Sequence, residues 1–443
     1  MVKKCFSFFL SIFILICSAI SVSAYTPSTF TVAAEGVLFA NLDTGTVMYE
    51  KNADKRLYPA SLTKIMTAAV VLDECKDPAS LKITVTEAAL LPLLGTDSSV
   101  FNLVDGEVLS ALDLLYIMLV HSANDAANVL AIQFGQGSIS DFITKMNQKA
   151  TDLGMSATHF VNAHGLQDEN HYTTPRDMYL LAKHALENEI FKEIVGTVRY
   201  TVPANNKSEA RTVASTIYLQ DPNSPVSDYY YPYASGVKTG YTDEAGRCLV
   251  STATKGGTTY LCVLMNSPVT NSAGVKIRQE FTDSKLLYQW AFDTFEYRQV
   301  LDSSTPVGEC PVELGKDCDF VSLVLKEPVN AILPKDADNS TIKVEIELKS
   351  DPATAPIEKG EVLGAATIKY GGETLAKTEV VAMTEVEKSS VLAFVKFFTD
   401  LLSGKAFKII LISIAGLIVI FILYCAWLNR RRKKRRRRRP RKF

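Results

Sequence analysis

Hydrophobic residues of this chain fall into two long runs near its ends and into shorter periodic patterns between them. The first run covers residues 5–20, follows two lysines and precedes the small residues Val22-Ser23-Ala24. A basic start, an apolar middle and small residues at the end are typical of a secretory signal peptide. We therefore expect a signal peptide over residues 1–24, cleaved after Ala24. An uncleaved N-terminal anchor is the alternative.

The second run predicts a membrane-spanning helix. Ile409–Leu428 contains no charged residue, and a helix of that length spans about 30 Å, the thickness of a bilayer core. Every residue from Arg430 to Arg439 is Lys or Arg, which by the positive-inside rule keeps residues 429–443 in the cytoplasm. We expect a single-pass helix over residues 406–428 in the cell membrane, with the larger part of the chain outside. The basic tail would attract acidic lipids rather than nucleic acid.

The periodic patterns of residues 25–298 predict an α+β domain. Strand-like alternation over residues 33–42 and 47–49 frames a turn and indicates a hairpin. Apolar positions at helical spacing follow, with Ser110 as a candidate N-cap of the second helix. The predicted helices cover residues 61–72, 109–120, 140–153, 175–186 and 285–295, and further strands cover residues 236–238, 247–254 and 259–265. Strands on the outside with helices between them imply helices packed on an antiparallel sheet.

The pattern changes after about residue 298. Short strand-like runs separated by Gly, Pro and Asp turns predict a small all-β domain over residues 299–385. Residues 386–405 form a further segment, in which bulky apolar side chains between residues 389 and 402 share one helical face. That face would lie along the membrane surface or pack on the β domain, and the sequence leaves both open.

Charge is distributed unevenly along the chain. Of the 47 Lys and Arg residues, 12 lie in the tail and two in the signal peptide, so 33 face 48 Asp and Glu residues in the part between. A net charge of about −15 makes this part unsuited to binding nucleic acid. Five of the eight cysteines lie there without the C-x-x-C spacing of metal sites. Cys310 and Cys318 could close a disulfide across a short loop.

Ser61-Leu62-Thr63-Lys64 is the first of three motifs that carry chemistry. A serine in the first turn of a helix and a lysine three residues later project from one face. The helix N-terminus and partial burial both disfavour the ammonium and lower the pKa of the lysine. A neutral Lys64 would take the proton from Ser61 and activate it as a nucleophile. Alone, the motif is better explained by an N-cap serine and a solvated lysine.

Ser122-Ala123-Asn124 is the second motif and directly follows the predicted helix over residues 109–120. The Ser122 hydroxyl would relay a proton between Lys64 and a leaving amine. The Asn124 amide would hold Lys64 and a substrate carbonyl. An ordinary helix cap or turn is the other explanation of this short pattern.

Lys238-Thr239-Gly240 is the third motif and lies in a predicted strand. The edge of such a strand offers backbone groups to an extended peptide, and Gly240 lets the two backbones approach. Lys238 and Thr239 would attract an anionic terminus. The N–H of Tyr241 would pair with that of Ser61 to form an oxyanion hole.

The order S-x-x-K, S-x-N, K-T-G resembles that of the active-site-serine penicillin-recognising enzymes. The flanking segments Pro59–Lys64, Asn162–Leu166 and Lys238–Gly246 more closely resemble the low-molecular-mass penicillin-binding proteins, which are serine D-alanyl-D-alanine carboxypeptidases. The plan of signal peptide, catalytic domain, small β domain and anchor also resembles theirs, over nearly all of residues 25–428. The resemblance implies a β-lactamase/transpeptidase-like catalytic domain that removes the terminal D-alanine from peptidoglycan stem pentapeptides through an acyl-enzyme. It also implies inhibition by β-lactam antibiotics.

The resemblance further implies roles for individual residues. Ser61 would be the nucleophile, Lys64 its base, and Lys238 a binder of the substrate carboxylate. The family also uses an arginine downstream of K-T-G for that carboxylate. Arg278 is the candidate here, in a register uncertain by one residue, and Arg247 is the alternative. No cofactor or metal is expected.

Three other functions would use the same motifs. A D,D-endopeptidase would cut peptide cross-links with these residues. A β-lactamase shares the motifs, but class A enzymes carry an E-x-x-L-N pattern that is absent between Ser122 and Lys238. A non-catalytic wall-binding scaffold is the alternative from a different class, and intact motifs argue against it. His159, His164 and His171 are spaced too loosely for a metal site.

Overall fold

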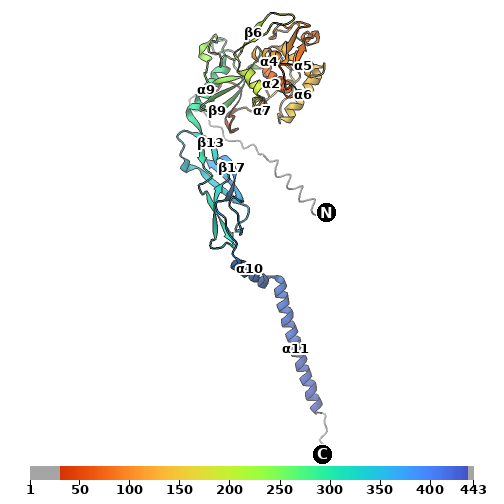
Figure 1. The fold of residues 1–443 in the computed structure, drawn as a ribbon, viewed down its shortest axis with the longest axis vertical. Coiled ribbons are helices and arrows are strands. Elements are labelled where there is room, and N and C mark those ends of the chain that lie inside the picture. The colour runs from red at the N-terminus through yellow and green to blue at the C-terminus, as the bar shows by residue number, and fades with distance from the viewer. Residues whose placement is uncertain (1–29, 438–443) are drawn as a thin grey trace, which may run out of the picture. The chain divides into compact units, whose positions relative to one another are not determined.

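The computed structural model describes residues 30–437, which form two compact units (Figure 1). Unit 1 contains the described chain up to Arg298 and also Ala331–Ala337, and unit 2 contains Gln299–Asn330 and the described chain from Asp338 onward. The predicted signal peptide over residues 1–24 lies outside the described residues, as do residues 438–443 of the tail.

Unit 1 is built on a five-stranded antiparallel sheet with the strand order β2-β1-β9-β8-β7. Its strands are β1 (Gly36–Asn41), β2 (Val47–Lys51), β7 (Ala234–Thr242), β8 (Gly246–Lys255) and β9 (Thr258–Ser267). The predicted hairpin and the three later strands are therefore confirmed. β7 is an edge strand, and β8 is its only partner among the described strands. Its outer edge therefore keeps backbone groups that can pair with an added peptide.

Apolar side chains cover both faces of this sheet because helices pack on each (Figure 1). One face includes Leu249 and packs with Phe281 of α9 (Gln279–Thr294). The other face includes Val250 and packs with the larger group of helices. Consecutive strand residues point to opposite faces. The consecutive β8 residues Leu249 and Val250 therefore belong to two different hydrophobic cores.

α2 (Thr63–Glu74) is the central helix of the larger core, with ten of its twelve residues buried. Ser110 caps α4 (Ala111–Val120) as predicted, because its hydroxyl accepts the Asp113 N–H at 3.0 Å in a capping box. The remaining helices of this side are α3 (Glu87–Leu90), α5 (Asn124–Phe134), α6 (Ile139–Asp152), α7 (Pro175–Ala185) and α8 (Glu189–Gly196). The sequence did not predict α3, α5 or α8.

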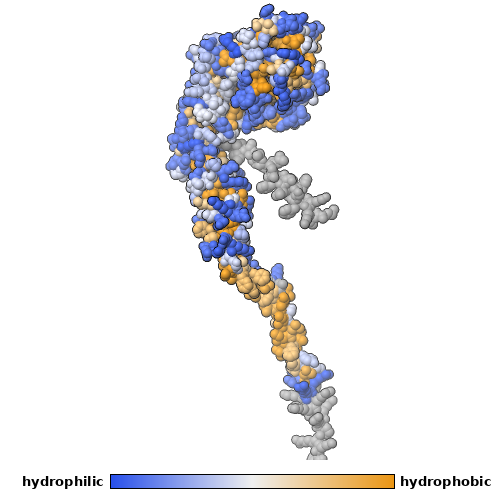
Figure 2. Space-filling model, in the orientation of Figure 1, coloured by the Kyte–Doolittle hydropathy of each residue, from blue (hydrophilic) through white to orange (hydrophobic). Residues whose placement is uncertain are grey.

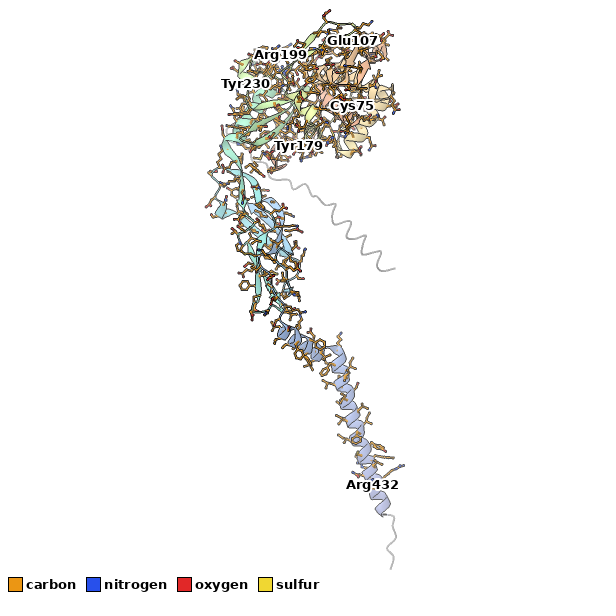
Figure 3. All side chains as sticks on the ribbon, in the orientation of Figure 1. Cys75, Glu107, Tyr179, Arg199, Tyr230 and Arg432 are labelled. Carbon is orange, nitrogen blue, oxygen red and sulfur yellow. The ribbon has the colours of Figure 1, made fainter. Side chains whose placement is uncertain are left out.

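Two small hairpins border the helices: β3 (Lys82–Thr84) pairs with β4 (Val108–Ser110), and β5 (Arg199–Val202) pairs with β6 (Arg211–Ala214). Glu107, directly before β4 (labelled in Figure 3), is fully buried and forms an ion pair with Arg211. Its carboxylate also accepts a hydrogen bond from Asn205 Nδ2 at 2.7 Å. Because a buried charge needs such partners, this carboxylate joins the two hairpins.

Unit 2 contains a six-stranded sheet with the order β14-β16-β17-β12-β11-β15. Its strands are β11 (Gly308–Glu313), β12 (Phe320–Leu325), β14 (Lys343–Leu348), β15 (Ala353–Thr354), β16 (Val362–Tyr370) and β17 (Glu373–Ala382), while β10 (Phe295–Leu301) and β13 (Val329–Pro334) run across the boundary between the units. The all-β prediction for this region is confirmed. The suggested disulfide is wrong, because Cys310 and Cys318 are free. Cys310 is fully buried, and its thiol lies 3.5 Å from the Pro311 carbonyl oxygen.

Two apolar helices end the chain. α10 (Ser390–Ser403) carries exposed large apolar side chains along its length and is joined to the β strands through an ion pair between Lys396 and Glu313. α11 (Lys405–Arg437) includes Phe407–Arg432, the one span in the described chain that is long and apolar enough to cross a membrane. Figure 2 shows the apolar surface of both helices.

Candidate active site

Ser61 lies on a tight turn that precedes α2. A 3₁₀ turn covers Ala60–Leu62, and the α-helix begins at Thr63, two residues later than the sequence predicts. Ala60 has a φ of 46°, a conformation that costs free energy for a residue with a Cβ. The Thr63 hydroxyl donates to the Ala60 carbonyl oxygen at 2.8 Å and holds this turn in place.

Two glycines let neighbouring segments approach the turn closely. A Cβ at Gly165 would lie 1.8 Å from the Ala60 carbonyl oxygen. A Cβ at Gly240 would lie 2.9 Å from the Pro59 carbonyl oxygen and 3.2 Å from the Ser61 nitrogen. The 1.8 Å and 2.9 Å distances are shorter than real Cβ contacts, and 3.2 Å is tighter than most of them. The K-T-G strand therefore lies directly beside the nucleophile because its third residue is glycine.

Lys64 is fully buried, and its amine contacts three oxygen atoms. Nζ lies 2.9 Å from Ser61 Oγ, 2.6 Å from Asn124 Oδ1 and 2.9 Å from the His164 carbonyl oxygen. Burial, and then the charge of Lys238, hold the pKa of Lys64 well below its usual value, while Asp125 opposes them. An amine in this state can accept a proton from the hydroxyl that it contacts.

Ser122 lies between α4 and α5, with a φ of 68°. Its hydroxyl accepts a hydrogen bond from Lys238 Nζ at 2.8 Å. Lys238 also donates to the Thr239 carbonyl oxygen at 2.9 Å, and burial lowers the pKa of Lys238 to about 7. Within residues 30–437, no hydrogen bond joins Ser122 to Lys64. The predicted relay between them would therefore need a bridging substrate atom.

Asn124 is the first residue of α5 and is buried. Its amide oxygen binds Lys64, as predicted. The next residue, Asp125, accepts the backbone N–H groups of Phe101 and Leu103, each at 3.0 Å. These bonds fix the loop before β4 against the start of α5. The loop and the S-x-N motif are thus held as one body.

The K-T-G motif occupies the middle of β7, with Lys238 facing Ser122 and Thr239 facing the opposite side of the sheet. The Thr239 hydroxyl lies 2.6 Å from the Thr216 hydroxyl, a partner that no sequence motif predicted. Tyr241 is 44% exposed, and its hydroxyl donates to Asp243 at 2.5 Å.

Arg278 directly precedes α9. Its Nε donates to Glu280 Oε1 at 2.6 Å, and its guanidinium lies 5.0 Å from the Tyr218 ring centre. Tyr218 is two residues from Thr216, so the segment 216–218 contacts both Arg278 and Thr239. Arg247, the alternative, is the β8 partner of Tyr241 and packs on its ring at 4.9 Å. Both arginines therefore lie near the end of the K-T-G strand.

Histidines of this region hold the Ala60–Leu62 turn that carries Ser61, which we call the nucleophile turn. His171 Nδ1 accepts the Val161 N–H at 3.1 Å, so its Nε2 carries the proton and donates to the Thr63 hydroxyl at 2.7 Å. Burial lowers the pKa of His164 to about 3 and that of His171 to about 4, which keeps both neutral. In the part of the chain that the structure describes, no three His, Cys, Asp or Glu side chains gather as metal ligands.

Two family models match the chain. One is described as D-alanyl-D-alanine carboxypeptidase and matches residues 22–269. The other is described as penicillin-binding protein 5, C-terminal domain, and matches residues 295–388.

Curated proteins with similar sequences carry the same description. The chain is 32% identical to D-alanyl-D-alanine carboxypeptidase DacF of Bacillus subtilis, over 82% of this chain and 88% of that protein. It is 29% identical to D-alanyl-D-alanine carboxypeptidase DacA of Haemophilus influenzae, over 92% of this chain and 97% of that protein.

Solved structures match as well. Penicillin-binding protein 5 of Haemophilus influenzae is 28% identical, has a TM-score of 0.63, and is matched over 82% of this chain and 100% of its own. The Streptomyces K15 DD-transpeptidase is 33% identical, has a TM-score of 0.54, and is matched over 60% of this chain and 100% of its own.

Proposed function

Because this chain belongs to the D-alanyl-D-alanine carboxypeptidase family of serine peptidases, we propose that Ser61 is the residue through which it removes the terminal D-alanine from peptidoglycan stem pentapeptides. The observation that carries this proposal is the fully buried Lys64 amine, 2.9 Å from Ser61 Oγ. Burial removes the stabilising solvent from the ammonium and leaves a base in contact with the hydroxyl.

In the first step Ser61 Oγ attacks the carbonyl carbon between the two terminal D-alanines, and its proton passes to Lys64. The N–H groups of Ser61 and Tyr241 stabilise the oxyanion. The close approach of Gly240 to the Ser61 nitrogen supports this pairing. The carbon–nitrogen bond then breaks, and the leaving nitrogen takes the proton that Lys64 removed from Ser61, while the Ser122 hydroxyl donates a hydrogen bond to that nitrogen.

The leaving nitrogen is the substrate atom that connects Ser122 with Lys64. Ser122 accepts a hydrogen bond from Lys238, so its own hydroxyl proton is free to point toward the substrate. A nitrogen lying between Ser122 and Lys64 would connect the two groups. Water then attacks the acyl-enzyme, Lys64 takes a water proton, and Ser61 leaves with a proton returned to its oxygen.

The terminal carboxylate binds on the other side of β7. Thr239 and Arg278 supply donors there, and Lys238 adds positive charge from the buried side of the strand. The peptide lies along the outer edge of β7 as an added strand. Asn124 holds Lys64 and offers its amide to a substrate carbonyl.

A membrane anchor would keep this site near the cell wall. We propose that α11 crosses the cell membrane once, with its basic end in the cytoplasm and residues 25–405 outside. The exposed apolar side chains of α10 would then lie along the outer face of the cell membrane.

Covalent labelling with a fluorescent penicillin tests the nucleophile. We expect one label on the full chain in detergent and none on the variant Ser61→Ala. A chain that labels at another residue, or Ser61→Ala that labels normally, would contradict the proposal. Absence of any label would favour the scaffold alternative.

Product analysis tests the reaction. We expect release of free D-alanine from a stem pentapeptide, at a rate that exceeds cleavage of a cross-linked dimer. Faster cleavage of the dimer would replace the carboxypeptidase with the D,D-endopeptidase. Rapid turnover of penicillin would instead indicate a β-lactamase.

A further inference from the structure

A cluster of charged side chains that includes Arg278 lies on the face of the sheet that packs with α9. Arg247 points to the same face as Leu249, because the two residues are separated by two positions along β8. Glu280 lies in the first turn of α9. We call Arg247, Arg278 and Glu280 the α9-face cluster.

Glu280 is the centre of the α9-face cluster. Only 1% of this residue is exposed. Its Oε1 accepts the Nε–H of Arg278 at 2.6 Å, while Oε2 has no hydrogen-bond partner among residues 30–437. Burial raises the pKa of Glu280, and the charges of Arg278 and Arg247 oppose that rise. A carboxylate this deeply buried costs free energy, so helix packing alone does not explain its presence.

The bond from Glu280 fixes the plane of the Arg278 guanidinium. Rings lie close to it, with the Phe281 ring centre at 4.4 Å and the Tyr218 ring centre at 5.0 Å. Among the described residues, neither terminal NH₂ group of Arg278 has a hydrogen-bond partner. Its side chain is 20% exposed. A guanidinium held at Nε with two free NH₂ groups matches the two oxygens of a carboxylate.

Arg247 adds a second positive charge. Within the described chain its side chain makes no hydrogen bond, and its Nε is buried without a partner. Burial and the nearby charge of Arg278 lower the pKa of Arg247. The cluster therefore holds two guanidinium groups and one carboxylate, which binds Arg278, and it keeps a net positive charge beside the K-T-G strand.

We propose that Glu280 is a positioning residue for carboxylate recognition: it holds Arg278 so that the two free NH₂ groups face the substrate terminus, while Arg247 keeps the cluster positive. This inference rests on the proposed function, because it assumes that the terminal carboxylate of the peptide binds beside Thr239. Glu280 does not touch the substrate. It acts by preventing the guanidinium from turning away.

The test compares two peptides that differ only at the terminus. One pentapeptide ends in the free D-alanine carboxylate and the other in the D-alanine amide, and mass spectrometry measures release of D-alanine or D-alaninamide from each. For Glu280→Ala we expect kcat/KM for the acid to fall roughly ten-fold, the size of one charge-assisted hydrogen bond, mainly through KM. The rate for the amide should change less than about two-fold.

Two further variants make this readout specific. Glu280→Gln should recover part of the loss, because the amide oxygen still accepts the Arg278 Nε–H. In Arg278→Ala, which itself loses the preference for the acid, adding Glu280→Ala should have no further effect on the acid-to-amide ratio.

Asp283→Ala is the matched control. Asp283 is an equally buried carboxylate on the same helix, but it accepts the N–H groups of Ala33 and Ala34 instead of an arginine. We expect it to lower the melting temperature and leave the acid-to-amide ratio unchanged.

The outcomes separate the inference from the proposed function. A Glu280→Ala ratio within two-fold of the wild type, or an equal loss in Asp283→Ala, would overturn the positioning role. A wild-type chain that releases neither product would overturn the proposed function, and the inference with it.

Discussion

The two units of this chain differ in how deeply their polar side chains are buried. Within the described chain, the buried polar and charged side chains all lie between Asn41 and Ser284, in unit 1. In unit 2, the ion pairs Lys316–Glu387 and Lys326–Glu379 leave their side chains about half exposed. Because burying a polar group costs free energy unless it gains partners, unit 1 is the costlier structure. The comparison indicates that the buried Lys64 and Lys238 are retained for chemistry, whereas buried carboxylates such as Glu107 hold parts of the fold together. The paired charges of unit 2 lie at its surface.

The strongest test of this contrast is the removal of the base. We expect Lys64→Met to slow acylation by a fluorescent penicillin by about a thousand-fold, since a general base contributes 10²–10⁴-fold. Stopped-flow or gel-based labelling rates measure the effect. A circular dichroism spectrum that matches the wild type shows that the fold is kept. A rate within ten-fold of the wild type would contradict the role of Lys64.

The next test perturbs the nucleophile turn without removing a polar group. Gly165→Ala places a Cβ 1.8 Å from the Ala60 carbonyl oxygen and requires φ near 92°, so Ser61 must move. We expect acylation to fall about a hundred-fold, as for a misplaced reacting group, and unfolding to become easier by about 2 kcal/mol or more. Labelling rates and chemical denaturation measure the two effects.

Gly154→Ala is the control for this glycine. Gly154 has a φ of 75°, but nothing lies within 4 Å of its Cβ position. The variant should therefore lose only the stability that the strained backbone conformation costs an alanine, and it should keep the wild-type labelling rate. Equal rates for the two alanine variants would mean that the contact with Ala60 is unimportant.

A smaller effect should appear in the pH dependence of stability. Lys238 has a pKa of about 7 in the folded chain against 10.5 ordinarily. Between these values the unfolded chain binds the additional proton, so the Lys238 contribution to the free energy of unfolding rises with pH. Comparing Lys238→Met with the wild type from pH 7 to pH 9 isolates this contribution. The stability difference should move in favour of the wild type as pH rises; a pH-independent difference would mean that Lys238 stays charged.

The smallest effect is expected in unit 2. Hydrogen bonding between Lys326 and Glu379 raises the pKa of the lysine and lowers that of the glutamate, but both groups face water. Exposed pairs contribute little because solvent and salt screen them. Lys326→Ala should therefore leave the melting temperature unchanged within error and leave penicillin labelling intact. A clear loss of either would show that the contrast between the units is overstated.

Much of unit 1 could be predicted from the sequence because its signals are local. Ser110 and Asp113 form the expected cap, and the alternating run after Ala33 forms the expected hairpin. α5 was missed because it is buried on nearly every side, which removes the amphipathic period that marks a surface helix. α8 was missed because eight residues give too short a pattern.

Some contacts of the candidate site could also be predicted from the sequence, and others could not. Ser61, Lys64 and Asn124 meet as the motifs predict, because each motif lies at the start of a helix that fixes its direction. Thr216 belongs to no motif, and only the fold brings it beside β7. Glu280 lies two residues after Arg278, but no motif marks the bond between them. The suggested disulfide failed because sequence spacing does not show which way a side chain points.

The burial of Lys64 and Lys238 has a practical consequence for labelling. Reagents that couple to amines prefer the uncharged form, so lowered pKa values would make these two lysines the most reactive in the chain if a reagent could reach them. Neither has any exposed surface. Accessibility rather than basicity should therefore direct such coupling to the outer lysines, and the chain could be attached to a dye or a bead through them while Ser61 still reacts with penicillin.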